Sequence, residues 1–255
     1  MKNKEFYIEC DRIKLHAKMD FPESYKEKMP CVIVVHGLTG NMEETHIKEV
    51  AKACVSCGYM ALRVELYGHG MSGGEFRNHT LFHWVVELLQ IIDYVKKLDF
   101  VTDIYLTGHS QGGAAIVLAA GMKADCIKAI MPLSPGMMLR DAANNGTFPN
   151  TYFDPENLGD EFLLFGEKAL STNYLRVCRA LPFEDCIQRY ENKVLIVHSD
   201  TDELVPYEYS VKLQQMYKNA ELVTIPDDDH CYTKNLDLVI KAVSDFLMKM
   251  NKQQK

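Results

Sequence analysis

Short apolar runs alternate along the chain with longer segments whose apolar positions recur at helical spacing. Because a strand covered on both faces is apolar throughout, we interpret the short runs as buried strands. The predicted strands are Cys31–Val35, Met60–Leu66, Asp103–Thr107, Ile127–Leu133, Lys193–His198 and Glu221–Ile225. The predicted helices are Glu44–Cys57, Leu81–Lys97, Gln111–Met122, Tyr207–Lys218 and Leu236–Met250. This alternation predicts an α/β fold, with helices on both faces of a mostly parallel, twisted sheet.

Two regions depart from this alternation. Phe6–Glu9 and Arg12–Lys18 alternate apolar and polar residues and are predicted to form an antiparallel pair. Residues 136–192, which follow the sixth predicted strand, are rich in aromatic residues and too long for an ordinary connection. Because long insertions in compact domains are usually functional, we expect a lid or cap at 136–192 on a core made of 1–135 and 193–255.

The predicted helix Leu81–Lys97 carries a clear apolar stripe. Trp84 and Leu88 lie on that stripe, whereas Glu87 and Gln90 are expected to face away from it. The single tryptophan is therefore predicted to belong to the core rather than to a ligand site.

Composition narrows the classes of partner. Of 255 residues, 47% are apolar, and 28 Lys and Arg against 35 Asp and Glu give a net charge of −7. This balance argues against nucleic acid and against a membrane surface as partners. No apolar stretch approaches the roughly 20 residues that cross a bilayer. The eight cysteines lie within apolar runs rather than in a disulfide framework, so reduced thiols and a cytoplasmic location are expected.

The strongest chemical signal is the sequence from Gly108 to Gly112, Gly-His-Ser-Gln-Gly, which lies between a predicted strand and a predicted helix. This G-x-S-x-G pattern in a strand-turn-helix context is typical of a nucleophile elbow, with Ser110 on a strained turn. A serine hydroxyl is a weak nucleophile, so Ser110 requires a base. We therefore look for a histidine that the fold can bring to Ser110.

Position selects the base and its acidic partner. Of the nine histidines, His230 follows the last predicted strand and so lies at the carboxyl edge of the sheet. Asp202 lies in the loop after the preceding strand and is predicted to orient His230, with Asp200 as the second choice. The order Ser110, Asp202, His230 is that of α/β-hydrolases. The backbone N–H groups of Leu38 and Gln111 are predicted to stabilise the oxyanion.

Other motifs are weaker. Gly68 to Gly73 spells G-x-G-x-x-G, but no helix follows at once, so nucleotide binding is not expected. Cys54 and Cys57 match C-x-x-C without a second ligand pair, and the acidic run Asp227 to Asp229 is read as a solvated turn. We therefore predict neither a cofactor nor a catalytic metal.

Together, His36-Gly37, Gly68-His69-Gly70, the elbow and Asp229-His230-Cys231 resemble the α/β-hydrolase superfamily, and within it the bacterial cinnamoyl (feruloyl) esterases. The resemblance covers nearly the whole chain. It implies that Tyr174 and Asp141 bind the phenolic hydroxyls of the substrate, and it suggests a homodimer. Asp141 is displaced from the spacing seen in that family, and Glu65 stands where an Asp usually precedes the Gly-His-Gly turn.

The expected activity is therefore hydrolysis of a small-molecule ester, with hydroxycinnamoyl (feruloyl, caffeoyl or coumaroyl) esters as the leading substrates. Aromatic residues in 136–192, together with Met137 and Met138, could enclose an aromatic acyl group. A monoacylglycerol lipase or general carboxylesterase would use the same three residues, and a serine aminopeptidase would act on peptides. A non-catalytic receptor on this fold normally tolerates loss of one of the three, whereas here all are present.

Overall fold

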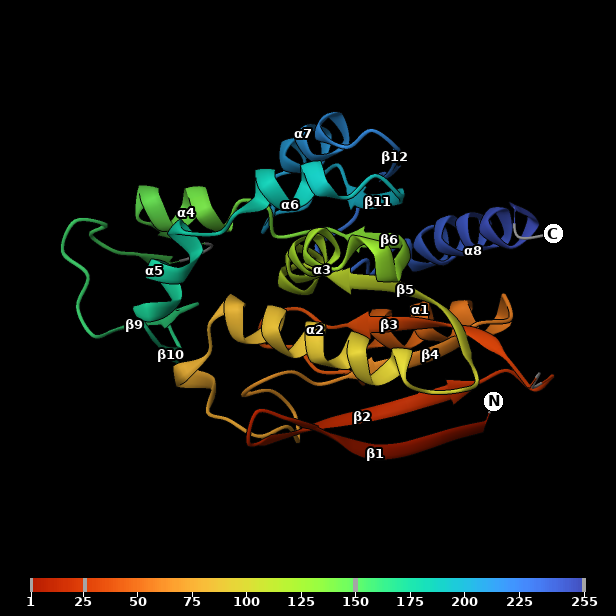
Figure 1. The fold of residues 1–255 in the computed structure, drawn as a ribbon. Helices are drawn as coiled ribbons and strands as arrows, with labels where there is room; N and C mark the ends of the chain where they lie inside the picture. The colour runs from red at the N-terminus through yellow and green to blue at the C-terminus, as the bar shows by residue number, and fades with distance from the viewer. Residues whose placement is uncertain (1, 25–26, 149–150, 254–255) are drawn as a thin grey trace.

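The computed structural model describes residues 2–24, 27–148 and 151–253. One eight-stranded sheet organises this part of the chain, in the order β1-β2-β4-β3-β5-β6-β11-β12 (Figure 1). The strands are β1 (Lys2–Cys10), β2 (Ile13–Phe21), β3 (Met29–Val35), β4 (Met60–Val64), β5 (Val101–His109), β6 (Ile127–Leu133), β11 (Lys193–Ser199) and β12 (Ala220–Ile225). From β4 to β12 neighbouring strands run parallel, and β1 and β2 add an antiparallel edge. The predicted fold class is confirmed.

Helices cover both faces of the sheet. One face carries α1 (Thr45–Ser56) and α8 (Leu236–Gln253). The other face carries α2 (Leu81–Lys96), α3 (Gln111–Met122), α6 (Phe183–Arg189) and α7 (Glu208–Met216). Two short 3-10 turns lie in the connections between these elements: η1 (Phe76–Asn78) precedes α2, and η2 (Ala124–Cys126) follows α3. Among the described helices, none combines the length and apolarity needed to span a membrane.

The insertion at residues 136–192 is called the 136–192 segment below, and its residues 149–150 lie outside the described residues. It contains α4 (Leu139–Asn145), the strands β7 (Thr147–Phe148), β8 (Thr151–Tyr152), β9 (Glu161–Leu164) and β10 (Lys168–Ser171), then α5 (Asn173–Arg179) and α6. Its two small hairpins belong to separate two-stranded sheets. Figure 1 shows α4, α5, β9 and β10 beyond the carboxyl ends of the parallel strands, whereas α6 packs against α3. Its role as a lid and the domain boundaries stay predictions.

Two details of the sequence interpretation are wrong. Arg12 lies in the turn between β1 and β2, where Asp11 and Arg12 both have positive φ, and not in a strand. Glu87 does not face solvent: it is buried, and its carboxylate accepts a hydrogen bond from the Tyr67 N–H at 2.9 Å. Burial raises the pKa of Glu87 to about 8. The prediction for Trp84 is confirmed, since its side chain is fully buried.

Candidate active site

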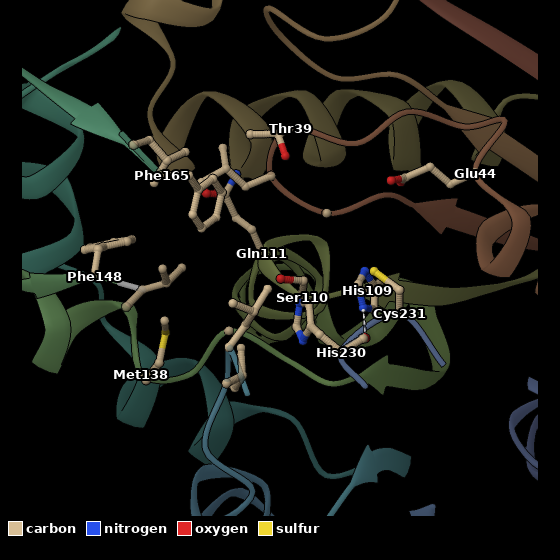
Figure 2. Close-up of a pocket in the computed structure, with 17 residues that line it drawn as sticks. Thr39, Glu44, His109, Ser110, Gln111, Met138, Phe148, Phe165, His230 and Cys231 are labelled. Atoms are coloured by element: carbon tan, nitrogen blue, oxygen red, sulfur yellow. Dashed lines mark hydrogen bonds between the residues drawn. The ribbon is translucent and has the colours of Figure 1, made fainter. Parts of the chain in front are cut away.

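Ser110 lies at the turn where β5 ends and α3 begins. Its φ of 55° is a conformation that a residue with a side chain adopts only under constraint. Close packing supplies that constraint: a Cβ on Gly112 would lie 2.3 Å from the His36 carbonyl oxygen, and one on Gly37 would lie 3.2 Å from the Ser110 Cβ. The Ser110 side chain faces the pocket shown in Figure 2.

His230 and Asp202 come together from the loops after β12 and β11. The Asp202 Oδ2 accepts a hydrogen bond from His230 Nδ1 at 2.6 Å, and the Asp202 side chain is fully buried. Asp200, the second choice, is exposed and instead accepts the Asp227 N–H. Because Nδ1 of His230 donates to Asp202, its Nε2 is left to accept a proton.

Asp202 is held in its ionised form. Burial alone would raise the pKa of its carboxyl, but hydrogen bonds from His198 and His230 outweigh burial and hold that pKa well below its usual range. His198 Nε2 lies 3.1 Å from Asp202 Oδ2, and the N–H groups of Leu204 and Val205 both donate to Oδ1. The sequence interpretation did not include His198, because a histidine inside a strand carries no catalytic pattern.

Ser110 and His230 line one pocket, and Figure 2 shows both side chains at its floor. His109, the residue before Ser110, links the two: its ring Nε2–H donates a hydrogen bond to the backbone carbonyl of His230 at 2.8 Å. In the part of the chain that the structure describes, no group hydrogen-bonds the Ser110 hydroxyl. Catalytic hydrogen bonds of this kind often form fully only with substrate bound. The arrangement can support proton transfer from Ser110 to His230.

Hydrogen bonds with two histidines hold the loop that carries Leu38 beside Ser110. His36 Nδ1 donates to the Gly37 carbonyl at 2.8 Å and its Nε2 accepts the Leu66 N–H. His69 Nε2 accepts the Thr39 N–H at 3.1 Å. Burial lowers the pKa of His36 to about 3 and of His69 to about 4, so both rings are neutral and can accept.

Two backbone N–H groups, those of Leu38 and Gln111, remain available as donors beside Ser110. Within the described ranges, no protein group accepts the backbone N–H of Leu38 or Gln111, and both residues line the pocket. The Gly68 to Gly73 turn, which spells a nucleotide motif, here holds His69 against the oxyanion loop. The sequence interpretation missed His36 and His69 as supports, although the His-Gly and Gly-His-Gly patterns marked their positions.

The structure places Tyr174 and Asp141, for which the resemblance implies phenolic-binding roles, outside the lining of the pocket. Tyr174 is fully buried and does not line the pocket; its hydroxyl donates to Gln111 Oε1 at 2.6 Å. Asp141 is exposed, lies outside the pocket lining and accepts a hydrogen bond from the Tyr209 hydroxyl. In this position Tyr174 supports the Gln111 side chain, which also contacts His79.

The opposite side of the pocket is apolar. Met138, Phe148 and Phe165 of the 136–192 segment face the nucleophile across the cavity (Figure 2), and Leu164 of the same segment also lines it. Leu204 and Val205 extend this surface from the loop that carries Asp202. The pocket therefore joins a polar reacting centre to a surface that suits an apolar acyl group.

The remaining motifs have structural roles. All eight cysteines are free, including Cys54 and Cys57. The acidic run is a solvated turn only in part: Asp227 is exposed, whereas Asp228 is buried and its carboxylate accepts the backbone N–H groups of Asp229, Lys234 and Asn235. Among the described residues, the potential metal ligands His46, His109 and Cys231 have their ligand atoms within 4.8 Å of one another.

Comparisons with known proteins show the family. The family model described as "Serine aminopeptidase, S33" matches residues 26–150, and the one described as "TAP-like protein" matches residues 164–255. The structure of Est1E from Butyrivibrio proteoclasticus with ferulic acid bound is 49% identical. It has a TM-score of 0.94, with 96% of this chain and 98% of that chain covered. A second Est1E structure is 46% identical, with a TM-score of 0.90 and the same coverage.

More distant relatives share the fold. The mitochondrial palmitoyl-protein thioesterase ABHD10 of Rattus norvegicus is 22% identical over 86% of this chain and 72% of its own length. The mouse protein ABHD10 has a TM-score of 0.79 at 19% identity, covering 97% of this chain and 99% of that chain. The chain therefore belongs to the α/β-hydrolase family of serine esterases that includes Est1E.

Proposed function

We propose that this carboxylesterase cleaves hydroxycinnamoyl esters, such as feruloyl, caffeoyl and coumaroyl esters, with Ser110, His230 and Asp202 as its catalytic residues. The observation that carries the proposal is the shared pocket, in which Ser110 faces an apolar surface containing Phe148 and Phe165. The bound ferulic acid in Est1E, which is 49% identical, supports an aromatic acyl group. A homodimer and a cytoplasmic location stay predictions.

We propose the following course for the reaction. Ser110 Oγ attacks the ester carbonyl while His230 Nε2 takes its proton, and Asp202 stabilises the imidazolium that forms. The N–H groups of Leu38 and Gln111 donate to the oxyanion, each contributing roughly 3 kcal/mol to barrier lowering. His230 returns the proton to the leaving alcohol, which departs and leaves an acyl group on Ser110. Water then attacks this acyl group with His230 as base, releasing the acid and regenerating Ser110.

Acyl-group profiling tests the proposal. The purified enzyme is given methyl ferulate, methyl caffeate, short-chain alkyl esters and a monoacylglycerol at matched concentrations. We expect the highest kcat/KM for the hydroxycinnamoyl esters. Higher values for alkyl acyl groups would instead assign a lipase or general carboxylesterase. Because one matching family model describes a serine aminopeptidase, aminoacyl anilides are included, and we expect no turnover of them.

A further inference from the structure

Three potential metal ligands converge next to the catalytic residues. His46 comes from α1, His109 from the elbow and Cys231 from the position after His230. Their ligand atoms all lie within 4.8 Å of one another, and His46 Nε2 is 3.2 Å from His109 Nδ1. Figure 2 shows His109 and Cys231 together at the end of the pocket away from Phe148. The catalytic steps above use neither His46 nor Cys231.

The proton arrangement on His109 suits a ligand. Its Nε2–H donates to the His230 carbonyl, so its Nδ1 carries a lone pair directed at His46. Metal-bound histidines usually donate their other ring N–H to a carbonyl or carboxylate in this way. Burial lowers the pKa of His46 to about 4 and that of His109 well below its usual range, so both imidazoles are neutral. Neutral imidazole is the form that binds metals.

We propose that His46, His109 and Cys231 form a Zn²⁺ site that inhibits the enzyme. Zinc binds nitrogen at about 2.0–2.1 Å and sulfur at about 2.3 Å, so tetrahedral ligands lie roughly 3.3–3.6 Å apart. The 3.2 Å nitrogen separation is close to that spacing. The Cys231 sulfur lies within 4.8 Å of both nitrogens and has to move inward to bind the ion. On binding, Cys231 loses its thiol proton to solvent, the His46 ring proton moves to Nδ1, and water takes the fourth position.

The surroundings favour a soft divalent cation. Two imidazoles and a thiolate select zinc or cobalt over magnesium, which prefers oxygen ligands. Glu44 lines the same pocket wall and adds negative charge near Cys231. Burial and nearby carboxylates, Glu44 and Asp229 among them, raise the pKa of the Cys231 thiol to about 11. The negative charge of these carboxylates disfavours a free Cys231 thiolate. The same charge favours a cation bound to that thiolate.

Inhibition is expected because the zinc site adds positive charge beside His230. This expectation rests on the proposed function, in which His230 is the catalytic base. The rings of His109 and His230 have centroids 4.6 Å apart. A zinc ion with one thiolate ligand carries a net positive charge beside His230, which must itself become positive during acylation. This repulsion destabilises the transition state more than the neutral bound substrate. Zinc should therefore lower kcat while changing KM little.

Cobalt titration tests the site independently of activity. Chelator-treated, full-length protein is titrated with Co²⁺, and we expect one equivalent to give a sulfur-to-cobalt charge-transfer absorption that Zn²⁺ removes and Mg²⁺ does not. Cys231→Ser should abolish this absorption, and His46→Gln should weaken Co²⁺ affinity at least about 10-fold. Cys126→Ser, a partly buried cysteine bonded by Lys96, is the matched control and should bind like the wild type. No absorption, or an absorption that persists in both site variants, would overturn the proposal.

Inhibition is measured separately on methyl ferulate. Zn²⁺ should lower kcat in the concentration range that displaces Co²⁺, and His46→Gln should shift inhibition to about 10-fold higher Zn²⁺. Metal binding without inhibition would remove the regulatory role. If the protein does not hydrolyse ferulate esters, the cobalt absorption still decides whether the site exists, so failure of the proposed function and failure of the site give different results.

Discussion

The two walls of the pocket are built in different ways. The catalytic wall comes from loops directly after strands of the eight-stranded sheet, and its polar groups are fixed by buried hydrogen bonds. The apolar wall comes from the 136–192 segment, whose short strands lie outside that sheet. Phe148, for example, is held by ring contacts with Phe162 and Tyr174. From this difference, and on the proposed function, we expect the sheet to support the reaction and the segment to select the acyl group.

Removing the nucleophile gives the largest expected effect. Ser110→Ala should lower kcat for every ester by about 10⁴-fold or more, because no other hydroxyl replaces the attacking oxygen. Hydrolysis of methyl ferulate and of an acetate ester is measured in parallel, with circular dichroism as the folding control. Equal loss on both esters assigns Ser110 to the reaction alone. Residual turnover near the wild-type rate would remove Ser110 as nucleophile.

Changing the carboxylate that orients His230 comes next. Asp202→Asn should reduce kcat by about 10³- to 10⁴-fold, because an amide stabilises neither the required tautomer nor the imidazolium. Asp200→Asn, at the exposed acid two positions earlier, is the matched control and should retain activity within about 3-fold. The ratio of ferulate to acetate hydrolysis should stay constant in both variants. A larger loss in Asp200→Asn would reverse the assignment.

The contrast between the walls also marks what the sequence could reveal. Ser110, Asp202 and His230 each follow an apolar strand run, and parallel strands bring their carboxyl ends to one edge, so the pattern alone brings them together. His198 could not be found this way: Asp202 is close in sequence, but a histidine inside a strand carries no catalytic pattern. The Gly-His-Gly pattern marked His69, but its bond to the distant Thr39 depends on packing. Glu87 occupied a polar position of an amphipathic helix, yet the Tyr67 N–H holds it inside.

The 136–192 segment was less predictable. Its elements are too short for a periodic pattern, and its side chains take their orientation from tertiary contacts, both within the segment and with the core. Tyr174 illustrates the result: its position in the chain fitted the resemblance, whereas packing directs its hydroxyl to Gln111. Variants in the segment are therefore the best means of testing the comparison.

Shortening an aromatic side chain on the apolar wall should change substrate preference. Phe165→Ala should lower kcat/KM for methyl ferulate by about 10-fold, equivalent to about 1.4 kcal/mol, and leave acetate hydrolysis nearly unchanged. Phe165 is 37% exposed, so its truncation removes little core packing. Tyr152→Ala, 84% exposed in the same segment and outside the pocket lining, is the control and should retain the wild-type preference. An equal fall for both esters would contradict the division between walls.

Tyr174 distinguishes support of the oxyanion site from substrate binding. Tyr174→Phe removes the hydrogen bond to Gln111 and should lower kcat by about 3- to 10-fold, since a neutral hydrogen bond contributes about 0.5–1.5 kcal/mol. The loss should be the same for ferulate and unsubstituted cinnamate esters. If Tyr174 instead bound the phenolic hydroxyl, KM would rise for methyl ferulate and not for methyl cinnamate.

The smallest effect on catalysis is expected for a change at the buried Glu87 of α2, where the measurable change is in the free energy of unfolding. Because burial raises the folded-state pKa of Glu87 to about 8, above an unfolded value of about 4.3, the folded protein binds this proton more tightly. The stabilisation is complete below about pH 4 and is lost as pH rises through 8, by at most about 1.4 kcal/mol per unit.

Glu87→Gln keeps an acceptor for the Tyr67 N–H and removes the titration. The difference in unfolding free energy between variant and wild type, measured by urea denaturation from pH 5 to 8, should therefore grow in favour of the variant, with kcat within about 2-fold of wild type. A difference that is independent of pH would show that Glu87 is ionised in the folded protein.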